Sequence, residues 1–176
     1  GVLIVFQLLV LIFSVMVHEI SHGAIALKLG DQTAKNAGRL TLNPLKHLDP
    51  VGSILLPMLM FFFGGPVFGW AKPVPYNPFN LKNPKSGGGL IAAAGPLSNL
   101  LVAAVFGIFL RLLRYGSALE SLVVLGALFQ LIIIINISLA IFNLMPIPPL
   151  DGSAILFSLL PRRFDVRRTS TSFTRA

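Results

Sequence analysis

The chain has 176 residues, of which 55% are hydrophobic and only 11% are charged. Because a soluble domain carries about a quarter charged residues, this composition excludes an ordinary soluble protein and indicates one compact membrane domain. The net charge of +8 does not indicate nucleic-acid binding, since the lysines and arginines cluster at the ends of apolar segments, where the positive-inside effect accounts for them. The absence of cysteine excludes disulfides and thiolate metal ligands.

The first third of the chain predicts one spanning helix and one shorter apolar element. The helix runs from Val2 to Leu29 and stops at Gly30. After a polar stretch, the apolar segment Val51 to Trp70 is interrupted by Pro57, and its apolar core lasts only about 13 residues, which is short for a span. We therefore expect a re-entrant or interfacial element there.

Two more spans are predicted in the rest of the chain. The prolines of Trp70 to Pro78 favour extended backbone, and three consecutive glycines predict a loop over Lys82 to Gly89. The second span covers about Gly89 to Leu113. The third begins near Leu119 and runs to Met145, where three prolines must break it.

A short helix is expected from Asp151 to Pro161, followed by a basic, flexible tail at Arg162 to Ala176. The predicted fold class is thus an all-α polytopic membrane protein with about three transmembrane helices and a re-entrant or extended element between the first and the second. Residues 1–161 form the core and residues 162–176 the tail.

The sequence His18-Glu19-Ile20-Ser21-His22 is an HExxH motif on the first helix. Residues four apart lie on one helical face, so both imidazoles can bind one metal ion while Glu19 takes a proton from a water molecule. The alternative is that the three side chains are satisfied by neighbours in a helix bundle. Ionisable side chains within an apolar helix are costly, which favours the metal site.

A catalytic zinc ion takes three protein ligands and leaves one position for water, so a single zinc per chain needs a third ligand. Without cysteine it must be a histidine or a carboxylate; the candidates are His47, Asp31, Asp49, Glu120, Asp151 and Asp165. Asp151 is favoured because it alone stands at a helix break within the apolar part of the chain. Its alternative role is to cap the short helix that follows.

Three motifs occur in a fixed order: HEISH in the first helix, GPLSN (Gly95 to Asn99) in the second, and NLMPIPPLDG (Asn143 to Gly152) in the third. Together they resemble the site-2 protease family of intramembrane zinc metalloproteases, over nearly the whole chain to about Pro161, in a minimal form without a PDZ or CBS domain. The resemblance implies these roles: His18, His22 and Asp151 as zinc ligands, Glu19 as the catalytic base, and Asn99 and Asn143 as polar active-site residues. It also implies cleavage of transmembrane proteins in regulated intramembrane proteolysis, often of transcription-factor precursors or anti-sigma factors.

The three motifs can meet only at one depth in the bilayer. Each lies ten or eleven residues, about 15 Å of helix, from a charged boundary. The end of the first helix, the start of the second and the end of the third must therefore share one face, so that Val51 to Trp70 does not cross. That face carries twelve of the fourteen lysines and arginines, which predicts that it is cytoplasmic.

Several residues keep two interpretations. Asn99 and Asn143 could bind the substrate carbonyl or bridge helices, and Asn136 is a bridge by preference. For His47 a surface position in a turn is favoured over a ligand or substrate contact. Gly69 to Tyr76 is interpreted as a substrate-docking edge or, alternatively, as a proline-rich interfacial turn.

For the whole chain, the rival to a protease is a non-catalytic metal-binding protein or transporter. A transporter would be expected to show inverted repeats, and the sequence has none.

Overall fold

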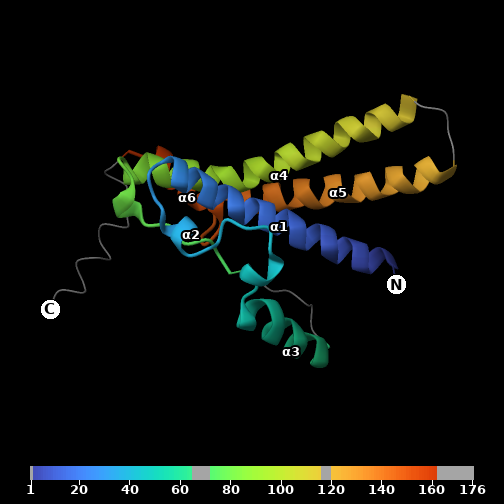
Figure 1. Ribbon diagram of the computed structural model, residues 1–176, viewed down its shortest axis with the longest axis horizontal. Helices are drawn as coiled ribbons and strands as arrows, with labels where there is room; N and C mark the ends of the chain where they lie inside the picture. Colours follow the sequence, from blue (N-terminus) through green and yellow to red (C-terminus); the bar gives the residue numbers. More distant parts are fainter. Residues whose placement is uncertain (1, 65–71, 116–119, 162–176) are drawn as a thin grey trace.

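A computed structural model describes residues 2–64, 72–115 and 120–161, and these residues form helices and irregular segments without any strand. Three helices are long and apolar enough to span a membrane: α1 (Val2–Lys28), α4 (Pro84–Tyr115) and α5 (Glu120–Leu144). The end of α1, the start of α4 and the end of α5 lie at the same end of the bundle (Figure 1). This arrangement confirms the predicted fold class and the expectation that the three motifs share one face.

Helix α4 is the centre of the bundle and packs against α1, α5 and the short helix α6 (Asp151–Leu159). A polar bridge joins α1 to α5, where the Asn136 amide nitrogen donates to Ser14 Oγ at 2.9 Å. Asn136 is fully buried and Ser14 nearly so. The prediction that Asn136 bridges helices is therefore confirmed, and the bridge holds α5 beside the turn of α1 that precedes His18.

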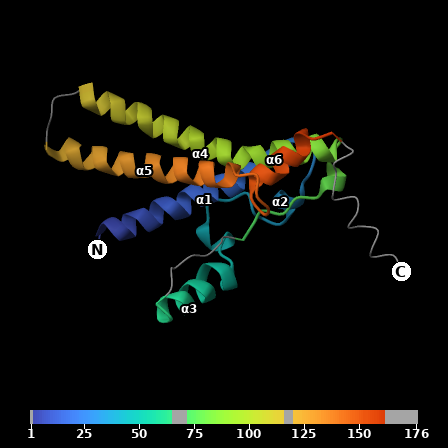
Figure 2. The same ribbon diagram turned by 180° about the vertical axis from the view of Figure 1, so that it is seen from behind.

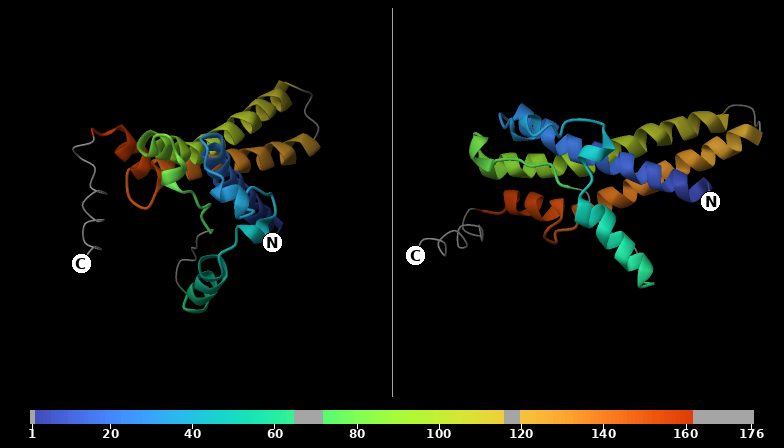
Figure 3. Two further views of the ribbon diagram at one scale, coloured as in Figure 1. Left: turned by 60° about the vertical axis from the view of Figure 1, so that its left-hand side comes forward. Right: turned by 60° about the horizontal axis from the view of Figure 1, so that its bottom comes forward.

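The segment between α1 and α4 is made of short pieces: α2 (Thr33–Asn36), a 3-10 turn at Pro44–Lys46, a π-helical turn at Pro50–Leu55, α3 (Leu56–Phe62) and a 3-10 turn at Pro78–Asn80. Helix α3 projects away from the bundle and packs mainly on the π-helical turn before it (Figure 3). With seven residues it is too short to cross a bilayer. The described part of the segment thus does not span, as predicted, while residues 65–70 lie outside the described residues.

Residues Lys72–Asn77 contain neither helix nor strand and are called the strap below. They precede the 3-10 turn at Pro78–Asn80, and they lie beside α1, where Val74 packs on Gly23. A Cβ added at Gly23 would come within 2.9 Å of Val74 Cγ1. Gly23 therefore allows the strap to approach the helix that carries the HExxH motif.

The predicted loop at Lys82 to Gly89 is wrong, because α4 begins at Pro84 and includes all three glycines. Proline is favoured at the first position of a helix, where its missing N–H is not needed. The glycines serve close packing: a Cβ at Gly89 would lie 2.1 Å from Ser158 Oγ of α6. Contact with α6 outweighs the low helix propensity of glycine.

The chain unwinds after α5, as the prolines predicted, and α6 starts at Asp151. Helix α6 then continues in the direction of α5, toward the end of the bundle where α4 begins (Figure 2). The turn is tight: a Cβ at Gly152 would lie 2.1 Å from the Leu144 carbonyl oxygen. Only glycine permits this approach, which holds the neighbouring Asp151 close to the end of α5.

Candidate metal centre

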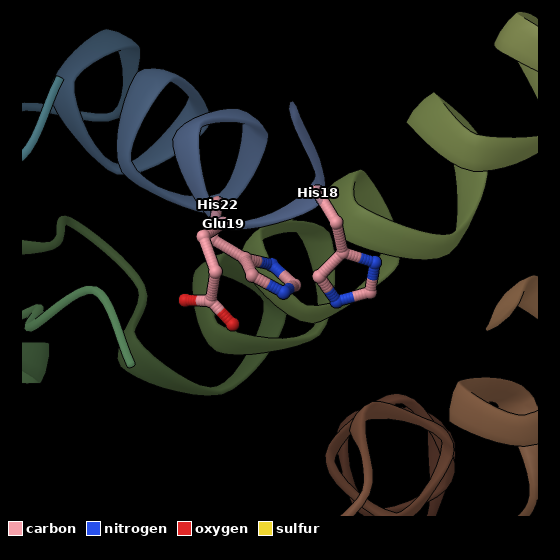
Figure 4. A group of neighbouring side chains, drawn as sticks. All are labelled: His18, Glu19 and His22. Atoms are coloured by element: carbon pink, nitrogen blue, oxygen red, sulfur yellow. The ribbon is translucent and has the colours of Figure 1, made fainter. Parts of the chain in front are cut away.

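The two histidines of the motif lie one turn apart on α1 and point to the same side, with Glu19 beside them (Figure 4). Their ring centroids are 4.6 Å apart. His22 Nδ1 lies 2.6 Å from the Ile91 carbonyl oxygen, and His18 Nδ1 lies 3.1 Å from Asn99 Oδ1. Both partners are oxygens of α4, which can only accept, so each ring donates from Nδ1, and Nε2 of each ring faces Asp151.

Asp151 lies opposite these lone pairs. Its Oδ2 atom is 3.1 Å from His18 Nε2 and 3.4 Å from His22 Nε2. The alternative role as a helix cap is not seen: the capping position of α6 is Leu150, and no side chain caps the helix. Asp151 Oδ2 is instead a buried oxygen to which the described residues offer no hydrogen bond beyond its contacts with the two imidazoles.

When both imidazoles are neutral, three atoms with lone pairs converge here: Nε2 of each histidine and Asp151 Oδ2. Such an arrangement is repulsive unless a cation lies at its centre. The separations fit zinc, since a tetrahedron with bonds of about 2.0–2.1 Å has edges of about 3.3–3.4 Å. The residues present thus fit the metal that the motif predicts.

Gly95 of α4 provides the space for both imidazole rings. A Cβ added there would lie 2.5 Å from Nε2 of both histidines. Real Cβ atoms essentially never come closer than 3.0 Å to another atom, so any larger residue at this position would displace the imidazoles. Gly95 thereby shapes the centre without being a ligand.

Glu19 also belongs to this cluster, because one ligand atom from each of His18, Glu19 and His22 lies within 4.8 Å of the others. Two carboxylates could thus complete the set of ligands. Glu19 Oε2 already accepts a hydrogen bond of 2.8 Å from the Val74 backbone N–H, whereas Asp151 Oδ2 faces both imidazoles and has no donor. This contrast favours Asp151 as the third ligand and leaves Glu19 beside the ion.

The cluster opens into a cavity of about 590 Å³. Its walls come from α1, the strap, α4, the end of α5, and the turn that leads into α6; they include Glu19, Val74, Ile91, Asn143 and Asp151. The cavity is large enough to admit a segment of polypeptide chain beside the metal position.

The two asparagines predicted as active-site residues occupy different places. Asn99 is fully buried, does not line the cavity, and meets His18 through its Oδ1. Asn143 lines the cavity, and its amide nitrogen donates to the Leu139 carbonyl of its own helix at 2.9 Å. The contact of Asn99 with a histidine ring is that of a residue which orients a ligand.

The expectation of a surface position for His47 is wrong, because only 3% of this residue is exposed. Its Nε2 donates to the Thr41 carbonyl oxygen at 2.8 Å, which closes the turn around it. The His47 carbonyl accepts the Lys72 N–H at 2.9 Å, so this residue also holds the start of the strap. Burial satisfies backbone groups of an irregular segment that packs beside a membrane helix.

Sequence reasoning missed Arg39 and Asp31, the two charged residues that hold the strap. Asp31 is fully buried and accepts hydrogen bonds from the Asn77 N–H, the Asn80 amide, and both the N–H and the hydroxyl of Thr33. Burial alone would raise the pKa of Asp31, but these donors outweigh it and hold the pKa below its ordinary value. The only signal in the sequence was a charged residue directly after a helix end.

Comparison with known proteins agrees with this site. The profile of Peptidase family M50 matches residues 114–175. A Bacillus subtilis protein named "Putative zinc metalloprotease YwhC" is 43% identical over 160 residues, which cover 89% of this chain and 69% of that protein. Proteins named "Putative zinc metalloprotease Rip2" from Mycolicibacterium smegmatis and Mycobacterium tuberculosis are each 31% identical, over 82% and 81% of this chain.

The chain thus belongs to Peptidase family M50, the site-2 protease family, as the three motifs predicted. It spans about half the length of the Rip2 proteins, 53% and 52%. No solved structure matches the chain.

Proposed function

We propose that this chain is a zinc-dependent endopeptidase that hydrolyses peptide bonds within or near transmembrane segments of membrane proteins. The observation that carries the proposal is the convergence of His18 Nε2, His22 Nε2 and Asp151 Oδ2 beside a cavity at the active-site end of three apolar helices. One zinc ion per chain, bound by these three residues, would supply Lewis-acid polarisation of a water molecule and of the scissile carbonyl.

The protein's own groups then have separate tasks. Glu19 is the general base: Val74 fixes one of its oxygens, and the other accepts no hydrogen bond from the described residues, so it is free to take a proton from water. Asn99 and the Ile91 carbonyl keep both imidazole protons on Nδ1, which holds the ligand lone pairs in place. Asn143, on the cavity wall, is placed to bind a substrate carbonyl.

The site lies among helices rather than on a soluble face, which supports transmembrane proteins as the substrates and the lipid bilayer as the setting. We place the active-site end in the cytoplasm, because it carries the larger share of lysine and arginine. We also assign the catalytic core to residues 1–161 and a basic tail to residues 162–176; the tail lies outside the described residues.

The docking edge predicted at Gly69 to Tyr76 falls partly on the strap, and residues 69–71 lie outside the described residues. The strap lines the cavity through Pro73, Val74 and Tyr76. The strap offers few backbone N–H groups to a substrate, because its prolines have no N–H and the Val74 N–H is bound to Glu19. The carbonyls of Val74 and Pro75, however, accept no hydrogen bond from the described residues, so we propose that the strap binds substrate N–H groups.

The test separates the base from the ligands. Glu19→Gln keeps the size of the side chain but removes the proton acceptor, so zinc should remain bound while cleavage of a transmembrane peptide disappears. His18→Ala, His22→Ala and Asp151→Ala should each lose zinc as well. A glutamine variant that cleaves at the wild-type rate would refute the role of Glu19 as the general base. A zinc-loaded wild-type protein that cleaves nothing would instead favour the non-catalytic metal-binding protein or transporter.

A further inference from the structure

We propose that Arg39 is a positioning residue for this peptidase, which anchors the strap so that the Val74 amide holds Glu19 beside the metal centre. The inference rests on the proposed function for its catalytic consequence. Its structural part, the anchoring of the strap, can be tested without any activity.

Arg39 is a buried cation without an acidic partner among the residues that the structure describes. Only 6% of the residue is exposed. Its guanidinium donates from Nη1 to the Lys46 carbonyl and from Nη2 to the carbonyls of Lys72 and Pro73, the latter at 3.3 Å. Burying a charge is costly unless several hydrogen bonds compensate it, and the planar fork of arginine reaches carbonyls on two segments at once.

These contacts fix the first half of the strap. Lys72 is held from both sides, because its carbonyl accepts from Arg39 and its N–H donates to the His47 carbonyl at 2.9 Å. At the other end, Asp31 accepts the Asn77 N–H at 2.7 Å. The cation therefore binds carbonyls at the start of the strap, and the carboxylate binds an N–H at its end.

Val74 lies between the two anchors and carries the effect to the active site. Its N–H donates to Glu19 Oε2 at 2.8 Å, only 8% of the residue is exposed, and its side chain lies against Gly23. The neighbours Pro73 and Pro75 offer no N–H, so no adjacent donor can replace the Val74 amide if the strap shifts. A shift of about 1 Å at a catalytic group is enough to lower a rate about 100-fold.

The acceptors of Arg39 all lie outside the three long helices. Removing the guanidinium should therefore release the strap while the packing of α1, α4 and α5, and with it the three metal ligands, stays intact. A residue needed only for folding would instead affect zinc binding and activity together.

The test uses Arg39→Gln, with Lys35→Gln as the matched control. Lys35 lies four residues earlier, is exposed, and makes no side-chain hydrogen bond with the described residues. Its substitution therefore removes the same charge without removing any such contact. Since the chain has no cysteine, Val74→Cys gives a single thiol whose labelling rate by a maleimide reports whether the strap is seated. Each protein is purified in detergent with its full zinc content.

In Arg39→Gln we expect zinc content and the circular-dichroism spectrum of the wild type, maleimide labelling of Val74→Cys at least about tenfold faster, and cleavage about 10- to 100-fold slower. Lys35→Gln should match the wild type in all of these. Arg39→Lys keeps the positive charge but lacks the planar guanidinium, so its labelling rate should lie between those of the wild type and of Arg39→Gln. This second variant preserves the test if the glutamine variant fails to fold.

A labelling rate that stays at the wild-type value in both Arg39 variants would overturn the proposal. Where the wild type is active, an Arg39 variant that is labelled faster but cleaves at the wild-type rate would overturn it too. If the wild-type protein with bound zinc cleaves nothing, the proposed function fails, while the labelling result still decides whether Arg39 anchors the strap.

Discussion

Substitution of Gly95 by alanine should abolish zinc binding although Gly95 is not a ligand. The new Cβ would lie 2.5 Å from Nε2 of His18 and of His22. Ordinary van der Waals contact begins at 3.4 Å, so the rings must move away by the difference, 0.9 Å. Zinc sites tolerate deviations of only about 0.2 Å in ligand distance, so a displacement of this size breaks the convergence on Asp151.

The expected loss of zinc affinity exceeds the roughly 10- to 100-fold loss that follows removal of a group which only orients a ligand, because both imidazoles are displaced together. Gly107→Ala is the matched control. It lies in the same helix, gains the same helix propensity, and its added Cβ would meet nothing within 4 Å.

The measurement is zinc per chain by elemental mass spectrometry on protein purified in detergent, with circular dichroism to establish that both variants are folded. Gly95→Ala should lack zinc and peptidase activity, whereas Gly107→Ala should retain both. A folded Gly95→Ala protein with wild-type zinc content would refute the assignment of the metal position to the convergence of the two imidazoles on Asp151.

Three further predictions concern the orienting asparagine, the buried carboxylate and the topology. Asn99→Ala leaves the proton of His18 Nδ1 without its acceptor, and chelator competition should show zinc affinity about 10- to 100-fold weaker; equal affinity would contradict the orienting role. Because the folded pKa of Asp31 is lowered, its contribution to stability should be complete above its unfolded pKa of about 3.9 and lost as the pH falls through the folded value. Thermal unfolding of the wild type should therefore show this acid loss and Asp31→Asn should not, while equal acid profiles would exclude Asp31 as the cause. Single cysteines at Asn36 and Asn83 should react with an impermeant reagent from the same, cytoplasmic side, and labelling from opposite sides would show that the segment between them crosses.

The sequence alone determined those features that depend on local pattern and on the bilayer as solvent. Apolar length predicted three spans, because a helix must carry about 20 apolar residues to cross. The spacing of His18 and His22 placed both rings on one face, and the prolines after Met145 required a break that frees Asp151 to turn inward. Each of these inferences needs only residues that lie within one continuous segment of the chain.

The partners of those side chains were decided by contacts between segments far apart in the chain. The sequence allows two roles for Asn99, and only the structure places its Oδ1 at 3.1 Å from His18 Nδ1, 81 positions away. Three glycines predicted a loop, but packing of Gly89 on Ser158 made them helical.

The sequence predicted least about the irregular segment between α1 and α4. The sequence predicts a surface position for His47 and assigns no role to Arg39, since polar side chains in a loop usually face water. Here the loop packs against a membrane helix, where unsatisfied N–H and C=O groups cost several kcal/mol each. Buried polar side chains must therefore satisfy that backbone, and which residue serves which carbonyl depends on how the loop folds onto α1, a property of the tertiary structure that no local pattern specifies.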